Sequence, residues 1–168
     1  MRMRTLQFSA GVFLTAIVLG IVAASDPTPA SAQANNPRYG KWRLKPTDPA
    51  APPSTNVMTY EPHNGTGMKI TINSLQPDGS LTPQWGYTTM FDGKDEPMTG
   101  SRAKDLASVK ILSDRVNEIT YKRGDGTINQ ILTNVISTDG TTLGIIYMSM
   151  DATGKTTRVT FATYEKMQ

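Results

Sequence analysis

Three of the carboxylates in this chain crowd one short string, FDGKDEPMTG, at residues 91–100. Asp92, Asp95 and Glu96 lie there around Lys94. Two facing carboxyl groups about 5 to 9.5 Å apart are what a glycoside hydrolase requires. The string also has the composition of a turn, because Gly adopts positive φ freely and Pro ends a strand. We therefore expect these four residues to form a rim loop with a structural role, and we keep an acid-dependent hydrolase as the less favoured reading.

Other groups for catalysis or metal binding are scarce. His63 is the single histidine, it sits in the turn-like string EPHNGTG, and the chain has no cysteine. A metal site or a nucleophilic triad needs several such groups held together. The absence of cysteine also excludes disulfides and thiolate chemistry. We predict no catalytic residue, no metal site and no cofactor, which favours a binding protein over an enzyme.

The bulk composition indicates one globular domain. The chain has 168 residues, of which 38% are hydrophobic and 18% charged, as in ordinary folded proteins. The formal net charge is +3, but the basic residues are scattered and form no stripe. Nucleic-acid binding usually requires such a stripe, so we expect no nucleic-acid partner.

The first 32 residues have the order of a secretory signal peptide. Arg2 and Arg4 precede an uncharged apolar run from Phe8 to Ala24, and Ala30-Ser31-Ala32 offers a small-x-small cleavage site. The alternative is a retained membrane anchor, although the run would span only roughly 25 Å as a helix. We expect residues 1–32 to be removed after Ala32. The mature chain would then be exported, periplasmic or secreted, without stable membrane insertion.

Beyond residue 32 the chain is predicted as a single domain over residues 38–168. Residues 33–55 hold a polar lead, a first strand and the string KPTDPAAPPST, whose prolines forbid a regular helix. Residues 56–168 hold the remaining strands, which alternate with turns. The expected strands are Gly40–Leu44, Asn56–Glu61, Met68–Asn73, Gln84–Phe91, Ala107–Leu112, Val116–Lys122, Ile128–Ile136, Leu143–Met150 and Arg158–Lys166.

Asp-Gly pairs punctuate these runs at residues 78–79, 92–93, 125–126 and 139–140. Asp-Gly between apolar runs is a strong hairpin signal, and strands so close in sequence pair antiparallel. A meander of many strands leaves two exposed edges unless it closes on itself. We therefore predict an all-β, antiparallel up-and-down barrel of about 8–10 strands with little or no helix. A β-sandwich is the alternative.

Two of the expected strands have an unusual distribution of apolar residues between their faces. Trp85, Tyr87 and Phe91 share one face of the strand Gln84–Phe91. Together with Tyr121 and Tyr147, they are our candidates for a ligand-binding lumen. In the strand Leu143–Met150 both faces are apolar, which a sheet with one solvated face does not need. A partner surface or an adhering segment would explain the second apolar face.

The chain resembles the lipocalin-like barrels of the calycin superfamily. The resemblance rests on Gly40-Lys41-Trp42 in the first strand and on the meander that follows. More closely, the chain is similar to a group of small exported bacterial lipocalin-like proteins whose function is uncharacterised. The strings that carry this likeness are GKWRLKP, TTMFDGKDEPMTG, ITYKRGDG, STDGTTLGI and ATYEKM.

The resemblance implies that Gly40 and Trp42 form the barrel floor, with the indole closing one end. It also implies a lumen that binds a small apolar or amphipathic ligand non-covalently. The alternative is a structural or interaction barrel of the cell envelope, with a filled core and no ligand. The residues leave open which ligand would bind and which oligomeric state the chain adopts.

Overall fold

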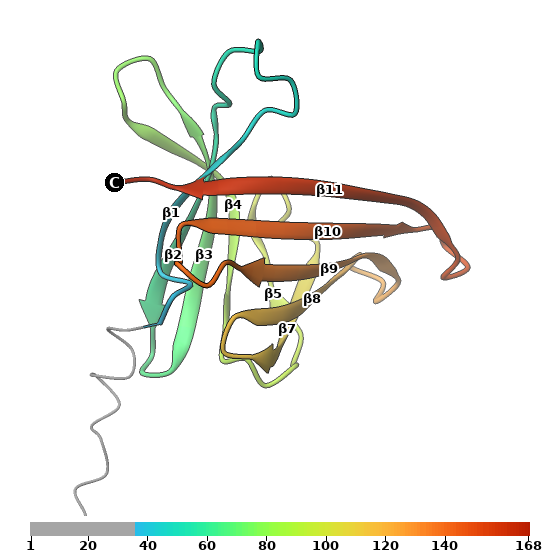
Figure 1. Cartoon of the computed structure of the whole chain (residues 1–168). Helices are drawn as coiled ribbons and strands as arrows, with labels where there is room; N and C mark the ends of the chain where they lie inside the picture. Colours follow the sequence, from blue (N-terminus) through green and yellow to red (C-terminus); the bar gives the residue numbers. More distant parts are fainter. Residues whose placement is uncertain (1–35) are drawn as a thin grey trace, which may run out of the picture.

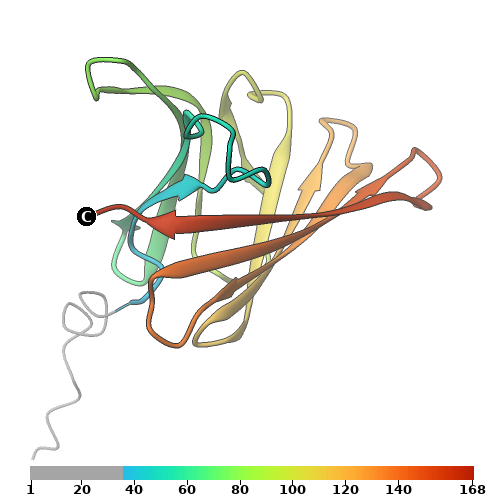
Figure 2. The ribbon, with the colours of Figure 1, turned by 45° about the horizontal axis from the view of Figure 1, so that its top comes forward.

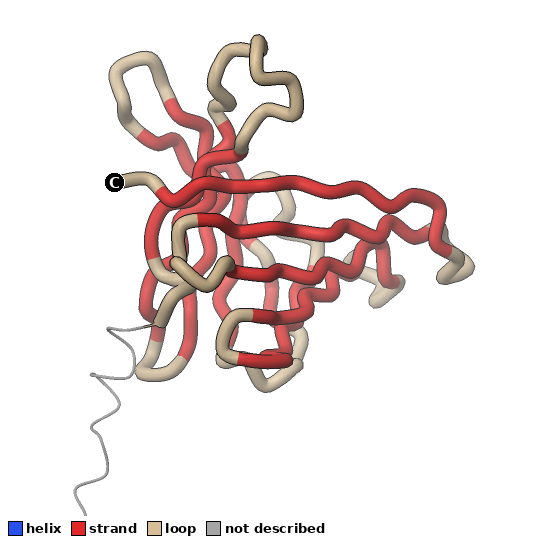
Figure 3. Tube along the Cα trace, viewed as in Figure 1, coloured by secondary structure: helices blue, strands red, loops and turns tan. Residues whose placement is uncertain are grey.

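The computed structural model describes residues 36–168, and the predicted signal peptide lies outside them. In that range the regular structure consists of strands joined by turns and loops (Figure 3). No helix of residues 36–168 is long and apolar enough to cross a membrane. The strands are β1 (Gly40–Leu44), β2 (Asn56–His63), β3 (Gly67–Leu75), β4 (Leu81–Thr89), β5 (Glu96–Pro97), β6 (Thr99–Gly100), β7 (Leu106–Ser113), β8 (Val116–Lys122), β9 (Ile128–Ile136), β10 (Thr142–Met150) and β11 (Thr156–Lys166).

The strands form one antiparallel sheet that curls into a nearly closed barrel. Its order is β5-β7-β8-β9-β10-β11-β1-β2-β3-β4-β6, so consecutive long strands are neighbours as the Asp-Gly turns predict. In Figure 1, β2, β3 and β4 run upright while β9, β10 and β11 run across them. The curvature of the wall is clearer in Figure 2. The all-β barrel predicted from the sequence is confirmed.

The first and last strands join. Trp42 pairs with Lys166 and Leu44 pairs with Tyr164 across β1 and β11. Just past β1, Lys45 N–H donates to the Thr163 carbonyl at 2.8 Å. This contact removes an edge that an open meander would leave exposed.

A closing segment, residues 92–100, fills the gap between β4 and β7. Its first half pairs with β7, where Pro97 lies opposite Leu106. Its second half pairs with β4, where Gly100 lies opposite Trp85. Met98, between the two halves, is buried. The string that we expected to be a rim loop therefore contributes two short strands, Glu96–Pro97 and Thr99–Gly100, to the barrel wall, while Lys94 and Asp95 lie in irregular backbone before them.

Gly100 explains why the closing segment needs glycine at its end. Its φ is +67°, in the left-handed region that glycine adopts without strain. A Cβ at this position would collide with the backbone carbonyl of Gln84. A side chain here would push the closing segment off β4.

The up-and-down order defines two ends. At the closed end lie residues 36–39, the β2–β3 turn and the β7–β8 turn. At the open end lie the turns at residues 76–80, 101–105, 123–127 and 151–155. Side chains that point inward between the two ends form the core.

Candidate ligand-binding site

The closed end is a fully bonded polar plug around Trp42. The indole is 0% exposed, and its Nε1–H donates to the Arg38 carbonyl at 2.9 Å. Lys166 places its Nζ 5.1 Å from the centroid of the indole ring. The structure therefore places Trp42 at the closed end of the barrel, with Gly40 beside it against the Lys166 stem.

Arg38 bridges this plug to the β7–β8 turn. Its guanidinium donates to Asp114 O at 2.7 Å, to Ser113 O at 2.8 Å and to Asn117 Oδ1 at 3.3 Å. Burial lowers the pKa of Arg38, and the nearby Asp114 carboxylate opposes that shift. All three guanidinium nitrogens donate, so the plug is held to a hairpin distant in sequence.

Sequence reasoning missed Arg38. Its string, RYGKW, shows a basic residue beside the Trp motif but not its acceptors. These are mostly backbone carbonyls more than 70 residues away. No local pattern marks such acceptors, because every residue type carries a carbonyl.

Phe91 does not share the lumen with the other aromatic residues. Strand β4 ends at Thr89, and Phe91 adopts a positive φ of +60°, which turns its side chain off the face of Trp85 and Tyr87. Its ring lies 5.9 Å from the Arg38 guanidinium carbon, so it packs at the closed end. The extended strand that we predicted as far as Phe91 is wrong in its last two residues for this reason.

Above the plug lies a cavity of about 150 Å³ within the barrel. Four of the five residues predicted for the lumen line it: Trp85, Tyr87, Tyr121 and Tyr147. The same wall includes Tyr60 and Tyr164, which sequence reasoning did not single out. The sequence did hold a signal for Tyr60. It follows Met58 by two residues, and side chains two residues apart on a strand point to the same face, here the buried one.

The aromatic rings of the cavity pack edge to face. Tyr121 lies 5.9 Å from Trp85 and 5.8 Å from Tyr87 between ring centroids, at interplanar angles of 87° and 79°. Such T-shaped pairs are favourable because the positive edge of one ring meets the negative face of the other. The three rings therefore make a rigid aromatic wall.

The hydroxyl groups on this wall are only weakly bonded. Tyr121 donates to Tyr87 at 3.4 Å, and the Tyr147 and Tyr164 hydroxyls lie 3.4 Å apart. Burial raises the pKa of Tyr121 to about 12, although its bond to Tyr87 and the cation of Arg102 pull the other way. Burial also raises the pKa values of Tyr60, Tyr87, Tyr147 and Tyr164. At neutral pH all five cavity tyrosines are uncharged.

Asn134 is the polar residue most deeply set in this wall. It is 1% exposed, and its Nδ2 donates to the Tyr60 hydroxyl at 3.2 Å. Its Oδ1 has no hydrogen-bond partner among residues 36–168. A buried carbonyl without a donor costs about 1–3 kcal/mol. The lumen therefore contains hydrogen-bonding capacity that the described chain leaves unused.

Arg102 stands at the mouth of the cavity, on the turn after β6. Its guanidinium carbon lies 5.1 Å from the Trp85 ring centroid and 4.7 Å from that of Tyr121. Nε and Nη2 contact Asp105 Oδ2 at 2.9 and 2.8 Å, and among residues 36–168 Nη1 has no side-chain acceptor. Arg102 therefore presents its Nη1 group as an unpaired cationic donor, among residues 36–168, beside an aromatic wall.

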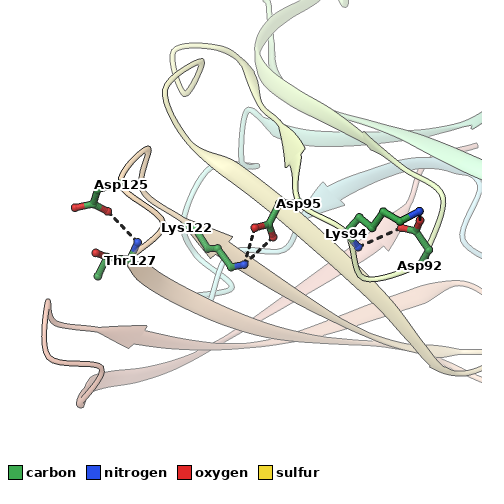
Figure 4. A network of polar contacts seen from close by, with 6 residues as sticks. All are labelled: Asp92, Lys94, Asp95, Lys122, Asp125 and Thr127. Carbon is green, nitrogen blue, oxygen red and sulfur yellow. Dashed lines mark hydrogen bonds and ion pairs between the residues drawn. The ribbon is translucent and has the colours of Figure 1, made fainter.

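Two of the acidic residues expected in the rim loop, Asp92 and Asp95, are exposed and form ion pairs with lysines (Figure 4). Asp92 pairs with Lys94 at 2.7 Å, and this hydrogen bond lowers the pKa of Asp92. Asp95 accepts two bonds from Lys122, at 2.8 and 2.7 Å. Glu96 is half-buried within β5. No Asp or Glu is among the buried residues of 36–168.

A larger hollow of about 480 Å³ lies outside the barrel, over the outer face of β1–β4 and β6. Its lining includes Lys41, Glu61, Lys69 and Thr71. These residues are those of an ordinary solvated sheet face. The lumen, with its dense aromatic lining, is the better candidate site.

Among known proteins, only solved structures give matches, and these bear on the fold. The chain matches no protein-family model, and a search of curated proteins finds no match. Among solved structures it is similar to the fluorescent protein UnaG. The wild-type protein gives a TM-score of 0.51 at 15% identity, covering 77% of this chain and 97% of that one. A point mutant of UnaG gives 0.52 at 14%, covering 79% and 97%. The likeness shows that the chain shares the β-barrel fold of UnaG.

Proposed function

We propose that this chain is an exported, lipocalin-like barrel that binds a small amphipathic molecule non-covalently in its lumen. One observation carries the proposal: a cavity walled by Trp85, Tyr87, Tyr121 and Tyr147 lies beneath the cation of Arg102. Apolar pockets with a few convergent polar groups are the usual form of small-molecule sites.

The cavity volume limits the size of the ligand. An engineered cavity of about 150 Å³ is known to hold benzene, and the lumen has the same volume, about 150 Å³. The ligand that fits without opening the wall is therefore one ring with short substituents. A long acyl chain would require the side chains to move.

The polar groups define the rest of the ligand. The free Nη1 donor of Arg102 favours an acidic group at the mouth, because charge-assisted hydrogen bonds to guanidinium are the strong ones. The tyrosine faces favour an aromatic ring below it. Benzoate combines both features, and benzyl alcohol keeps the ring without the charge.

The experiment is a titration followed by amide and indole NMR signals. We expect benzoate to shift the signals of Trp85 and Tyr121 with a lower Kd than benzyl alcohol does. Arg102→Gln should abolish the difference between the two compounds. Arg123→Gln, an exposed arginine on the neighbouring open-end turn, is the matched control and should preserve it. Absence of shifts with both compounds would contradict ligand binding in the lumen.

A second candidate function is the barrel with a filled core that acts through its surface. The volume of the lumen favours it, since about 150 Å³ lies below the roughly 300 Å³ at which drug-sized pockets begin. A barrel with a filled core predicts that native mass spectra show no adduct. It also predicts that crosslinking in the cell envelope captures a neighbouring protein. A retained adduct would decide for the ligand-binding barrel.

Export is proposed from the N-terminal pattern: Arg2 and Arg4, the apolar run Phe8–Ala24, and Ala30-Ser31-Ala32. Expression of the full chain in a bacterium followed by fractionation tests it. We expect the envelope or medium fraction to hold a protein that begins at Gln33. A full-length chain in the cytoplasm would contradict export.

A further inference from the structure

The inner part of the lumen holds a hydrogen-bond acceptor that no group of the described chain meets. Asn134 on β9 is 1% exposed and lines the cavity. Its Oδ1 has no hydrogen-bond partner among residues 36–168. Buried side-chain polar atoms are nearly always hydrogen-bonded, so this exception marks a place where a donor from outside the chain can bind.

Asn134 differs from the two other residues of the described range that bury an unpaired side-chain oxygen, Asn56 and Asn129. Both of these residues are only partly buried. Asn129 is not among the residues that line the cavity, and Asn56 lines it from the first residue of β2, at the open end. Asn134 therefore offers its acceptor inside the lumen, away from the mouth.

Tyr60 determines which atom of the Asn134 amide is left without a partner. The amide Nδ2 donates to the Tyr60 hydroxyl at 3.2 Å, and that hydroxyl donates its own proton to the Met58 thioether at 3.7 Å. A hydroxyl has one proton to donate. Because Tyr60 donates it to Met58, the amide turns its N–H to Tyr60 and keeps its carbonyl oxygen free. The group that meets this oxygen must be a donor.

Asn134 and Arg102 lie at opposite ends of the cavity that both line. Arg102 stands on the open-end turn, with its guanidinium carbon 4.7 Å from the centroid of the Tyr121 ring. Tyr121 pairs with Gln130, and the strand continues from there toward the closed end. From residue 130 to residue 134 a strand extends about 13 Å. A ligand that bonds to both groups therefore carries its two polar groups at opposite ends.

We propose that the lumen selects a single-ring aromatic acid with a hydrogen-bond donor para to the acid. The acid faces Arg102, and the hydroxyl or amino group opposite it donates to Asn134 Oδ1. This inference rests on the proposed ligand-binding function and adds the identity of the group at the inner end of the ligand. A donor there satisfies an acceptor that otherwise costs free energy, whereas a methyl group of similar size leaves it unsatisfied.

The first experiment compares para-hydroxybenzoate with para-methylbenzoate in NMR titrations of protein purified from cells that express the full chain. The two probes share their charge, their ring and nearly their shape, and at pH 7 the phenol keeps its proton as tyrosine does. We expect para-hydroxybenzoate to bind with a Kd roughly three- to tenfold lower, the contribution of one neutral hydrogen bond. A purely apolar pocket would instead favour the methyl compound, because a buried hydroxyl without a partner loses its hydration.

Two variants locate the source of this preference. Asn134→Leu should remove or reverse it while para-methylbenzoate still binds. Asn129→Leu is the matched control, because it makes the same substitution on the same strand at an unpaired oxygen that lies away from the cavity. This variant should preserve the preference. A preference that survives Asn134→Leu, or that both variants remove, overturns the proposal.

The second experiment needs no substitution and follows the side-chain carbonyl carbon signal of Asn134. We expect para-hydroxybenzoate to move this signal downfield as Oδ1 accepts a bond, and para-methylbenzoate to leave it nearly unchanged. Equal Kd values for the two probes, or an Asn134 signal that both probes move alike, overturn this inference. In that case the proposed function stands, because the ring still binds. Absence of shifts at Trp85 and Tyr121 with both probes overturns this inference and the proposed function together.

Discussion

The closed end and the lumen of the barrel differ in how completely their buried polar groups are hydrogen-bonded. At the closed end, Arg38 and the Trp42 indole are bonded to acceptors at 2.7–3.3 Å. In the lumen, the tyrosine hydroxyl pairs lie at 3.4 Å, and Asn134 keeps an acceptor without a donor. Tyr87, Tyr121 and Asn134 in the lumen are buried like Arg38 and Trp42 at the closed end, so burial alone does not cause the difference.

The contrast separates a part of the interior that stabilises the fold from a part that is open to a ligand. A satisfied buried network rigidifies a structure, whereas a partly satisfied one costs free energy. The closed end thus behaves as the anchor of the barrel. The lumen retains capacity that only an incoming molecule or water can use.

Replacing each tryptophan by alanine gives the largest expected contrast. Trp42→Ala should lower the free energy of unfolding by about 3–5 kcal/mol, because it leaves a cavity and removes the bond to Arg38. Trp85→Ala, at a half-buried position, should cost clearly less. Urea unfolding followed by circular dichroism measures both. Equal losses would mean that the plug is not the anchor.

Alkaline pH tests the buried tyrosines of the lumen. The folded-state pKa of Tyr121 is about 12, against an ordinary value of 10. A raised tyrosine pKa stabilises the fold fully below pH 10, and that contribution is lost as the pH rises toward 12. Two pKa units correspond to about 3 kcal/mol.

We therefore expect the free energy of unfolding to fall steeply from pH 10 upward, with tyrosinate absorbance appearing as the chain unfolds. The variant Tyr121→Phe should show a shallower fall over the same range. Tyrosinate that appears near pH 10 while the barrel stays folded would show that the cavity is wet.

Two buried asparagines offer the finest comparison, because the same substitution should act differently at each. Asn117 is 2% exposed and accepts from Arg38, whereas Asn134 is 1% exposed and has an unbonded oxygen. Asn117→Leu should destabilise by about 1–3 kcal/mol, since it leaves a buried cation short of an acceptor. Asn134→Leu should be nearly neutral or stabilising. Thermal unfolding of the two variants measures the change in stability of each. Equal losses of stability would contradict the distinction between the closed end and the lumen.

Much of the fold could be predicted from local pattern. The bounds of β1, β8 and β9 agree with the sequence-based strands, because alternation and Asp-Gly turns are local signals. The inward face of Trp85 and Tyr87 followed from the same alternation. Whether these residues bind a ligand stays a prediction.

What escaped prediction depends on contacts between distant segments. The carbonyls that hold Arg38 come from another hairpin. The closing segment divides its hydrogen bonds between β4 and β7, and a turn-like composition conceals that arrangement. Phe91 lies outside the lumen because its own backbone has a positive φ, a conformation that phenylalanine seldom adopts.

The pairing of β1 with β11 also governs when the barrel can form. Lys45 and Glu165, which meet beside this seam, are 120 residues apart in sequence. Contacts of such high order are slow to form. In a growing polypeptide β1 can pair with β2 early, but its other edge stays unpaired until β11 has been synthesised. The seam between β1 and β11 is therefore among the last contacts to form.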